Sequence, residues 1–458
     1  MLQQELAAFV ERTAKEFGIP GVAAGVLAEG REIVASYGVT SVDNPLPVDG
    51  RTLFHLASVT KTFTATAMMR LVAEGRVELE APVRRYVPEL ELADESVAAR
   101  ITVLQLLNHT AGLDWNLIDD GEGDQSLAGF VAKLKALPLI APPGTRASYS
   151  QAGYNLAGHI IEKVTGLSFE KAVAELVLAP AGLSDTVFGA DEVLVRRFAV
   201  GHNRGEDGTL TPARPWAAWP AGSHGNNPGG GIASSVSDLL RWARFQLGDG
   251  DGVLPSGELR RMREQTVELR ASTLGDGFGI CWFLREVGGI GTIGHGGSGN
   301  GQFAELLIVP EQNFAVVSLA NAGPEGYPFN RAVVRWALEN YLGVVEREPE
   351  PVPYDEARAR QVTGRYAIDA MNLDIATDGA RLTLAVGIKP EIRAASDAEM
   401  PPDYAPAAMG LLPGDGDEYI ITEGGLKGQR GFFTRDDDGA VIGVDLAGRL
   451  FGRTTEVS

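Results

Sequence analysis

Two places in the chain combine a serine with a lysine three residues later. The first is Ser58 and Lys61, in "LFHLASVTKTFTA", and the second is Ser168 and Lys171, in "SFEKAVAEL". A serine hydroxyl is a weak nucleophile at neutral pH and needs a base nearby, and residues three apart on a helix share one face. Either lysine could accept the proton of its serine, provided that its amine is neutral. The spacing alone therefore predicts either a nucleophile with its base or the start of an ordinary helix.

The residues that follow each serine distinguish the two places. The segment after Lys61, "TFTATAMMRLVAEG", is largely apolar on all sides, which is typical of a helix inside a protein. Burial destabilises an ammonium, so Lys61 could act there as a base. The helix after Ser168 is amphipathic, and it places Lys171 beside Glu170 in solvent. We therefore predict chemistry at Ser58 and a helix cap at Ser168.

The bulk composition limits the classes of function. The chain has 458 residues, of which 44% are hydrophobic, and a formal net charge of −20. These values predict a soluble globular protein of about two or three domains. So acidic a surface repels phosphate backbones and anionic lipids, so we expect no nucleic-acid or membrane partner. The single cysteine, Cys281, excludes an intrachain disulfide. The sequence shows neither a secretory signal nor an apolar run that could span a bilayer, which predicts a cytoplasmic location.

Strand-like segments lie at both ends of the first 345 residues, with helices between them. An amphipathic N-terminal helix is followed by "GVAAGVLAEGREIVASYG", which predicts a β-hairpin. The strand-like runs "FGICWFL", "GTIGHGG", "FAELLIVP" and "FAVVSLANAG" come later, before a last helix. This order predicts an α+β domain over residues 1–345, whose mainly antiparallel sheet mixes strands from both ends.

A break rich in proline and charge, "EREPEPVPYDEARAR", follows this domain. It predicts a linker over residues 346–361. Beyond it, short alternating segments such as "RLTLAVG" and "EYIITEGG" are separated by Gly and Asp turns. Residues 362–458 are therefore predicted to form a small antiparallel β-barrel.

Several motifs in one order resemble the serine β-lactamase and penicillin-binding protein superfamily, over about residues 5–343. The branch is that of class C β-lactamases, DD-carboxypeptidases, D-aminopeptidases and family VIII esterases. "LFHLASVTKTFTA" matches the first motif, "PPGTRASYSQAGYNLAGHIIEKVTG" is similar to the region of the second, and "GHGGSGNGQFAELLIVPEQNFAVVSLAN" resembles the third. The resemblance implies a β-lactamase/transpeptidase-like domain, with an antiparallel sheet flanked by helices and a helical subdomain. The C-terminal module resembles the lipocalin-like barrels of D-aminopeptidase-type members.

The resemblance also implies a role for particular residues. Ser58 would attack a carbonyl carbon, and Lys61 and Tyr149 would share the work of general base and acid. With an ammonium beside it, Tyr149 is expected to titrate as a phenolate near neutral pH. The backbone N–H groups of Ser58 and Ser298 would form the oxyanion hole. The remaining family positions would contact substrate, and they are Gln151, His295, Gly296 and Gly297.

Two of these positions depart from the family pattern. Gln151 stands where the second motif has Asn, and its amide reaches one methylene further, which predicts poor turnover of classical β-lactams. His295 stands where many β-lactamases have Lys. Because a histidine is only partly charged at neutral pH, we expect weak recognition of a substrate carboxylate. Several peptidases and esterases of the superfamily carry histidine there, which favours one of these over a dedicated β-lactamase.

We predict a serine hydrolase that works through an acyl-enzyme on small amides, peptides (including D-configured residues) or esters. The alternatives are a β-lactamase or DD-carboxypeptidase and, from another class, an inactive scaffold with the penicillin-binding fold. Intact Ser58, Lys61 and Tyr149 argue against the scaffold, because folding does not require a buried lysine. No metal-ligand motif or phosphate-binding loop is present, so we expect neither a metal nor a cofactor. The sequence leaves the oligomeric state open.

Overall fold

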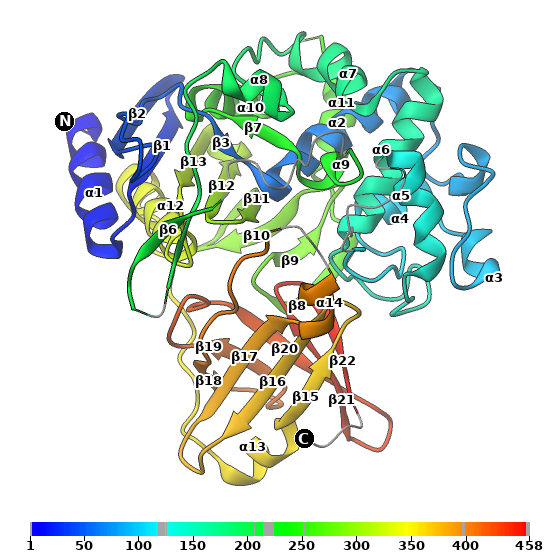
Figure 1. The fold of residues 1–458 in the computed structure, drawn as a ribbon, viewed down its shortest axis with the longest axis vertical. Helices are drawn as coiled ribbons and strands as arrows, with labels where there is room; N and C mark the ends of the chain where they lie inside the picture. Colours follow the sequence, from blue (N-terminus) through cyan, green and yellow to red (C-terminus); the bar gives the residue numbers. More distant parts are fainter. Residues whose placement is uncertain are drawn as a thin grey trace.

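The computed structural model describes residues 2–117, 124, 126–205, 207–213, 224–250, 252–395 and 399–454. Within them the chain forms a larger α+β part and a smaller barrel, which lies below it in Figure 1. The predicted fold class, an α+β domain followed by a small antiparallel barrel, is confirmed. The exact domain limits and the linker over 346–361 stay predictions.

An eight-stranded antiparallel sheet forms the centre of the larger part, in the order β2-β1-β13-β12-β11-β10-β9-β8. Strands from both ends of this part meet as predicted, because β1 pairs with β13 and Val22 lies opposite Ala320. The expected hairpin is β1 with β2, joined at a turn in which Glu29 and Gly30 have positive φ. The strands are β1 (Gly21–Ala28), β2 (Arg31–Gly38), β8 (Val267–Ser272), β9 (Gly275–Phe278), β10 (Phe283–Val287), β11 (Ile290–Gly299), β12 (Gln302–Val309) and β13 (Phe314–Ala320).

Helices cover both faces of this sheet, so alternate residues of its central strands enter two different cores. On one face α1 (Leu2–Phe17) and α12 (Gly326–Leu342) pack on Val22 and Val316. On the other face α10 (Val236–Leu247) packs on Ala23 and Val317. A strand buried on both faces is apolar along its whole length, which is why "FAVVSLA" shows no alternation with polar residues.

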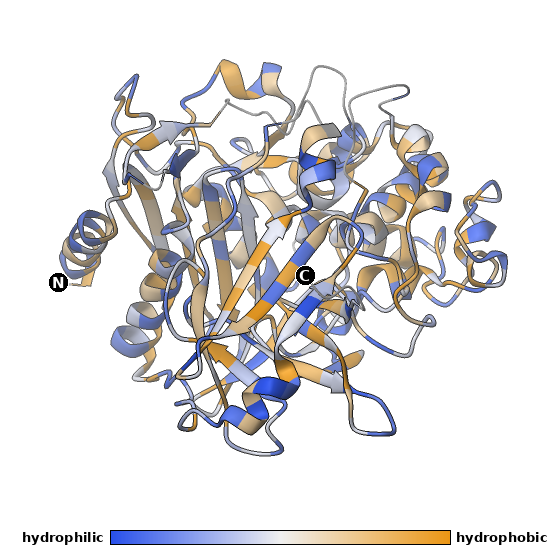
Figure 2. Cartoon of the chain, turned by 60° about the horizontal axis from the view of Figure 1, so that its bottom comes forward, coloured by the Kyte–Doolittle hydropathy of each residue, from blue (hydrophilic) through white to orange (hydrophobic). Residues whose placement is uncertain are grey.

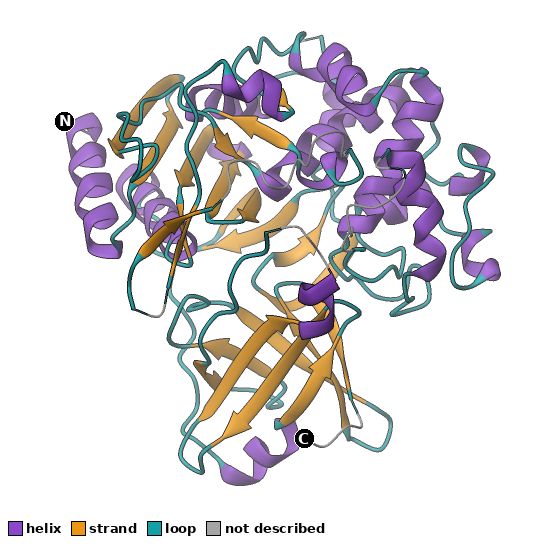
Figure 3. Ribbon diagram, viewed as in Figure 1, coloured by secondary structure: helices purple, strands orange, loops and turns teal. Residues whose placement is uncertain are grey.

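The other helices gather on one side of the larger part, where Figure 3 shows most of the helical ribbon. The helix α2 (Thr60–Ala73) lies in the middle of them and is buried on nearly every side. The remaining helices and turns of the larger part are η1 (Ala57–Val59), η2 (Val83–Arg85), α3 (Glu95–Ala98), α4 (Val103–Leu107), α5 (Leu127–Lys133), η3 (Leu134–Ala136), α6 (Gln151–Thr165), α7 (Phe169–Val173), η4 (Ala174–Leu178), α8 (Ala190–Leu194), α9 (Asn227–Gly230), α11 (Ser256–Arg261) and, between β12 and β13, η5 (Pro310–Gln312).

The larger part also contains two small three-stranded sheets. In one of them β3 (Phe54–His55) pairs with β7 (Ile232–Ser234), which also pairs with β4 (Val187–Phe188). Because β3 ends two residues before η1, this pairing fixes where the chain enters α2. The second sheet consists of β5 (His202–Arg204), β6 (Leu210–Pro212) and β14 (Ala322–Gly323).

The C-terminal part is a closed barrel of eight antiparallel strands. Side chains fill its interior, among them Tyr366, Tyr419 and Phe433. Figure 2 shows hydrophobic and hydrophilic residues alternating along its strands, as a barrel with one buried face requires. The strands are β15 (Gly364–Ala367), β16 (Met371–Thr377), β17 (Leu382–Ile388), β18 (Ala407–Leu411), β19 (Glu418–Ile421), β20 (Arg430–Arg435), β21 (Val441–Leu446) and β22 (Arg449–Arg453), with the helices α13 (Glu356–Val362) and α14 (Pro390–Ala395).

The barrel is joined to the larger part by direct hydrogen bonds. The hydroxyl of Thr273 donates to the carbonyl of Arg430 at 3.0 Å and accepts the backbone N–H of Arg430 at 2.7 Å. On the same side, Arg270 forms an ion pair with Glu418.

A long and apolar helix of the kind that crosses a bilayer does not occur among the described residues.

Candidate active site

Ser58 and Lys61 lie side by side at the start of α2. Ser58 is in the 3₁₀ turn η1, and Lys61 is one turn further along, with none of its surface exposed. Lys61 Nζ lies 3.2 Å from Ser58 Oγ, within hydrogen-bond reach. The helix around them is apolar on most sides, which excludes water from the amine.

The surroundings of Lys61 suit a neutral amine. Burial lowers its pKa well below the usual value for lysine; Cys281 opposes this shift, and the Arg449 guanidinium adds to it. Lys61 donates to Gln151 Oε1 at 2.5 Å and to the carbonyl of Gly229 at 2.7 Å. A neutral amine has two N–H bonds and one lone pair. With both N–H bonds used by these two acceptors, the lone pair is left for the proton of Ser58 Oγ.

Tyr149 completes the group from the loop that precedes α6. Its ring centroid lies 4.8 Å from Lys61 Nζ on one side and 5.0 Å from the Arg449 guanidinium carbon on another. The ring of His109 packs against it at 4.4 Å, and His109 Nδ1 accepts the backbone N–H of Ser150. The Tyr149 hydroxyl is buried beside the Ser58 hydroxyl.

The expectation that Tyr149 is a phenolate near neutral pH is wrong. Burial raises the pKa of its phenol, and the neighbouring Ser58 hydroxyl and Arg449 guanidinium oppose the shift without cancelling it. The phenol is therefore protonated at neutral pH. A protonated phenol beside a neutral amine can pass protons without storing a buried charge.

Ser298 lies on β11, which runs directly against η1. A Cβ atom on Gly297 would come within 2.0 Å of the Leu56 carbonyl oxygen and 3.2 Å of the Ser58 nitrogen, so only glycine allows this approach. The approach brings Ser298 to the same wall of the site as Ser58. Their predicted role as the two donors of an oxyanion hole stays a prediction.

Gln151 and His295 both lie close to Lys61 without lining the open space in front of Ser58. The side chain of Gln151 packs against Gly229, where a Cβ would come within 2.0 Å of its amide nitrogen. His295 is buried, stacks on Phe283 at 4.2 Å and has Nδ1 2.7 Å from the carbonyl oxygen of Gly296. Burial lowers the pKa of His295 to about 3, so this histidine carries no charge at neutral pH.

The barrel supplies a residue that the sequence analysis missed. The turn between β21 and β22 has positive φ at Ala447 and Gly448, and its tip enters the site. There the backbone N–H of Tyr149 donates to the carbonyl of Gly448 at 2.7 Å. The next residue is Arg449, which is half-buried between the rings of Tyr149 and Trp115. Its one local signal is the short hairpin "DLAGRL", which says nothing about what the turn contacts.

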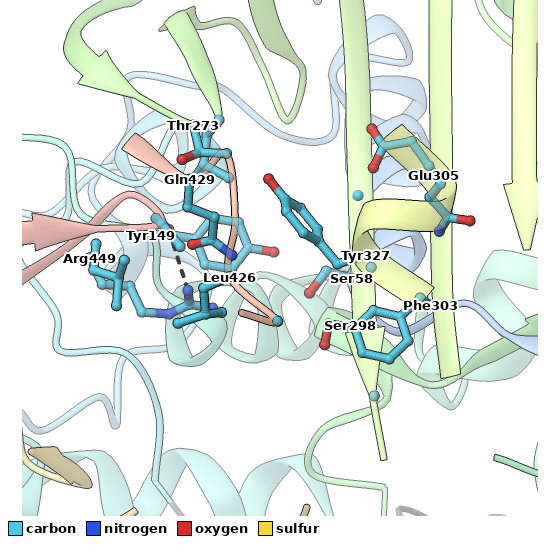
Figure 4. A pocket seen from close by; sticks show the side chains of 18 of the residues that line it. Ser58, Tyr149, Thr273, Ser298, Phe303, Glu305, Tyr327, Leu426, Gln429 and Arg449 are labelled. Atoms are coloured by element: carbon cyan, nitrogen blue, oxygen red, sulfur yellow. Dashed lines mark hydrogen bonds between the residues drawn. The ribbon is translucent and has the colours of Figure 1, made fainter. Parts of the chain in front are cut away.

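A cavity of about 580 Å³ opens where these elements meet. Figure 4 shows Tyr149 and Arg449 on one side of it and Ser58 and Ser298 on the other. The predicted residues that line it are Ser58, Tyr149, Gly296, Gly297 and Ser298. No group of three or more His, Cys, Asp or Glu side chains within the described ranges could hold a metal ion.

Ser168 serves as the cap that the sequence predicts. Its side chain accepts the backbone N–H of Lys171 at the start of α7. Lys171 is mostly exposed and lies 4.0 Å from Glu175. In the second Ser-x-x-Lys pattern, Ser168 therefore caps a helix, and it does not form a nucleophile–base pair with Lys171.

Comparison with known proteins places the chain in a family. The Beta-lactamase family profile matches residues 6–339, so the chain belongs to the beta-lactamase family, a family of serine hydrolases. Penicillin-binding protein 4 of Amycolatopsis lactamdurans is 33% identical over 317 residues, which are 67% of this chain and 82% of that protein.

Solved structures match the chain over its whole length, barrel included. SurE, solved with D-Leu, has a TM-score of 0.73 and 25% identity, and the match covers 99% of each chain. The octameric penicillin-binding protein homologue from Pyrococcus abyssi has a TM-score of 0.69 and 24% identity over 98% of this chain and 100% of that one. The resemblance stated from the motifs is thereby confirmed.

Proposed function

We propose that this protein is a serine hydrolase that forms an acyl-enzyme on Ser58. One observation carries the proposal: the buried amine of Lys61 lies 2.5 Å from Gln151 Oε1, 2.7 Å from the Gly229 carbonyl oxygen and 3.2 Å from Ser58 Oγ. A lysine in water would be an ammonium and could not accept a proton. This lysine is arranged as a base.

The reaction we propose has two halves. Ser58 Oγ attacks the carbonyl carbon of the substrate, its proton passes to Lys61, and the oxyanion is held by the N–H groups of Ser58 and Ser298. The tetrahedral intermediate then expels the leaving amine or alcohol, which takes the proton from Lys61 by way of the Tyr149 phenol. This leaves an ester on Ser58. Water attacks that ester in the second half, and the same groups return the proton to Ser58 Oγ.

The substrates we propose are small amides, peptides and esters, including those with a D-configured residue. The neutral and buried His295 supports this choice over a dedicated β-lactamase, because it offers no cation to a substrate carboxylate. SurE, which matches this chain over 99% of each, was solved with D-Leu, and this supports the choice of D-residues. The cavity volume suits a ligand of a few residues.

A second candidate function is that of a β-lactamase or DD-carboxypeptidase. The observation in its favour is the relative at 33% identity, which is a penicillin-binding protein. Against efficient lactam turnover stands Gln151, whose longer side chain already bonds Lys61 and fills the space beside Gly229.

A substrate panel tests the proposal. Wild-type enzyme and Ser58→Ala are compared on D-amino-acid amides, a short-chain p-nitrophenyl ester and nitrocefin. We expect the amides or the ester to be cleaved faster than nitrocefin, and Ser58→Ala to cleave none of them. A nitrocefin rate far above the others would establish the second candidate. Mass spectrometry after treatment with a fluorophosphonate should show an adduct on Ser58, and its absence would favour an inactive scaffold.

A further inference from the structure

The cavity in front of Ser58 continues into a second chamber. From Ser298 the lining follows β11 back to Gly296 and reaches β12 and α12, where Glu305, Tyr327 and Arg331 face it. Figure 4 shows Glu305 and Tyr327 in the same cavity as Ser58. A barrel segment that includes Tyr404 also lines this cavity. A molecule bound at Ser58 can therefore extend along the strand toward Glu305.

Glu305 is the unpaired group of this chamber. It lies on β12 directly opposite Gly296, and a Cβ on Gly296 would come within 3.0 Å of its Oε2. The glycine thus leaves the carboxyl open to the strand edge that substrate is expected to follow. Glu305 makes no hydrogen bond and no ion pair with any described residue. Glu305 is half-buried, so its carboxyl has lost part of its hydration without gaining a partner, and a ligand that donates to it would recover that cost.

The neighbouring cations form their ion pairs with a different carboxylate, although Arg331 and Arg285 lie close enough to Glu305 to oppose the rise of its pKa. Glu346 forms ion pairs with Arg285, Arg331 and Arg335, so the cations of this region are fixed on a different carboxylate. The Tyr327 hydroxyl is buried and interacts with the Arg331 guanidinium. The carboxyl of Glu305 is therefore the group of this chamber that a ligand could still pair with.

We propose that this chamber binds a protonated amine of the substrate, with Glu305 as the group that recognises it. The inference rests on the proposed function, because it describes what a substrate of Ser58 carries at its far end. Burial raises the pKa of Glu305 to about 7, with Arg331 and Arg285 opposing the shift, and a bound ammonium would oppose it further. A carboxylate in this setting distinguishes an ammonium from a methyl group of the same size by about tenfold.

Two matched pairs of N-acylated D-alanine amides test the proposal. In the first pair the leaving amine is 4-aminobutylamine or pentylamine. In the second pair the acyl group on D-alanine is 5-aminopentanoyl or hexanoyl, with one common leaving amine. We expect kcat/KM to be about tenfold higher for the ammonium member of one pair. That pair also shows whether the chamber takes the acyl or the leaving side.

The variant Glu305→Gln should remove this preference, so that the ammonium and methyl members of that pair are cleaved at the same rate. The matched control is Glu311→Gln, because Glu311 follows the same strand in the exposed turn η5 and lies outside the cavity. Equal rates for both members of both pairs, or a preference that survives Glu305→Gln, would overturn the proposal.

Binding separates this proposal from the proposed function. In Ser58→Ala protein, calorimetry compares the affinities of the ammonium and methyl members, with and without Glu305→Gln. A preference of about tenfold that depends on Glu305 supports the chamber even if no amide is turned over. Equal affinities contradict it even if the enzyme is an active hydrolase.

Discussion

The same four-residue pattern occurs twice in this molecule with opposite results. At Ser58 and Lys61 the side chains lie 3.2 Å apart and the amine is fully buried. At Ser168 and Lys171 the serine side chain is bonded to a backbone N–H, and the lysine lies in solvent beside Glu175. The spacing is identical, so the difference comes from the surroundings of each helix.

The comparison shows that the surroundings of a lysine, and not its spacing from a serine, decide whether it can act as a base. α2 is packed into the larger part on almost every side, so Lys61 loses its hydration and its pKa falls. α7 exposes one face to water, and the side chain of Lys171 lies on that face. Hydrogen bonds to two acceptors, Gln151 and Gly229, also fix the orientation of the Lys61 amine. Lys171 has no such acceptors among its hydrogen bonds with described residues.

The largest difference between the two patterns should appear when each lysine is replaced. We expect Lys61→Met to lower kcat/KM by about 10³ to 10⁴, since it removes the base while keeping the volume. Lys171→Met is the matched control and should change kcat/KM little. Steady-state rates on the best substrate of the panel measure both. Lys61→Arg should be as inactive as Lys61→Met, because a guanidinium does not give up its proton; an active Lys61→Arg would rule out the lysine as base.

Tyr149→Phe should have the next largest effect. The phenol stays protonated, so its expected work is to carry a proton between Lys61 and the leaving group. We expect kcat for an amide to fall by about 10². An activated ester needs little protonation of its leaving group, so its acylation rate should fall less. Pre-steady-state measurement of acylation on both substrates checks this, and equal losses would contradict a role in leaving-group protonation.

Arg449→Met tests whether the barrel contributes to the base. The positive charge of Arg449 lowers the pKa of Lys61, so its removal raises that pKa. Activity requires the neutral amine, and the rising limb of the pH profile of kcat/KM should therefore move to higher pH. The loss of activity should therefore be largest at the acidic end of the profile. Arg449→Lys keeps the charge and should keep the limb near its wild-type position; a limb that does not move in Arg449→Met would show that the barrel leaves the base unaffected.

Much of the fold and half of the site follow from local sequence. The apolar helix after Ser58, the hairpin around Gly30 and the alternating segments after residue 361 each reflect a period that neighbouring residues set. Arg449 was missed because its contact with Tyr149 joins residues 300 positions apart, and a hairpin turn does not indicate what its tip touches. Glu305 had a local signal, a lone carboxylate in the apolar strand "FAELLIVP". Its meaning depends on Gly296 and on the three arginines held by Glu346, which only the assembled structure shows.

The smallest effect should come from the second serine. Ser168→Ala removes the side-chain acceptor that caps α7, which typically costs about 1 kcal/mol of protein stability. The helix lies away from the cavity, so kcat/KM should stay at the wild-type value. Thermal unfolding followed by circular dichroism measures the loss, and Ser168→Asp, which keeps a capping oxygen, should recover most of it. A loss of activity in Ser168→Ala without a loss of stability would mean that the two patterns are not separated by burial after all, and that the second one also takes part in chemistry.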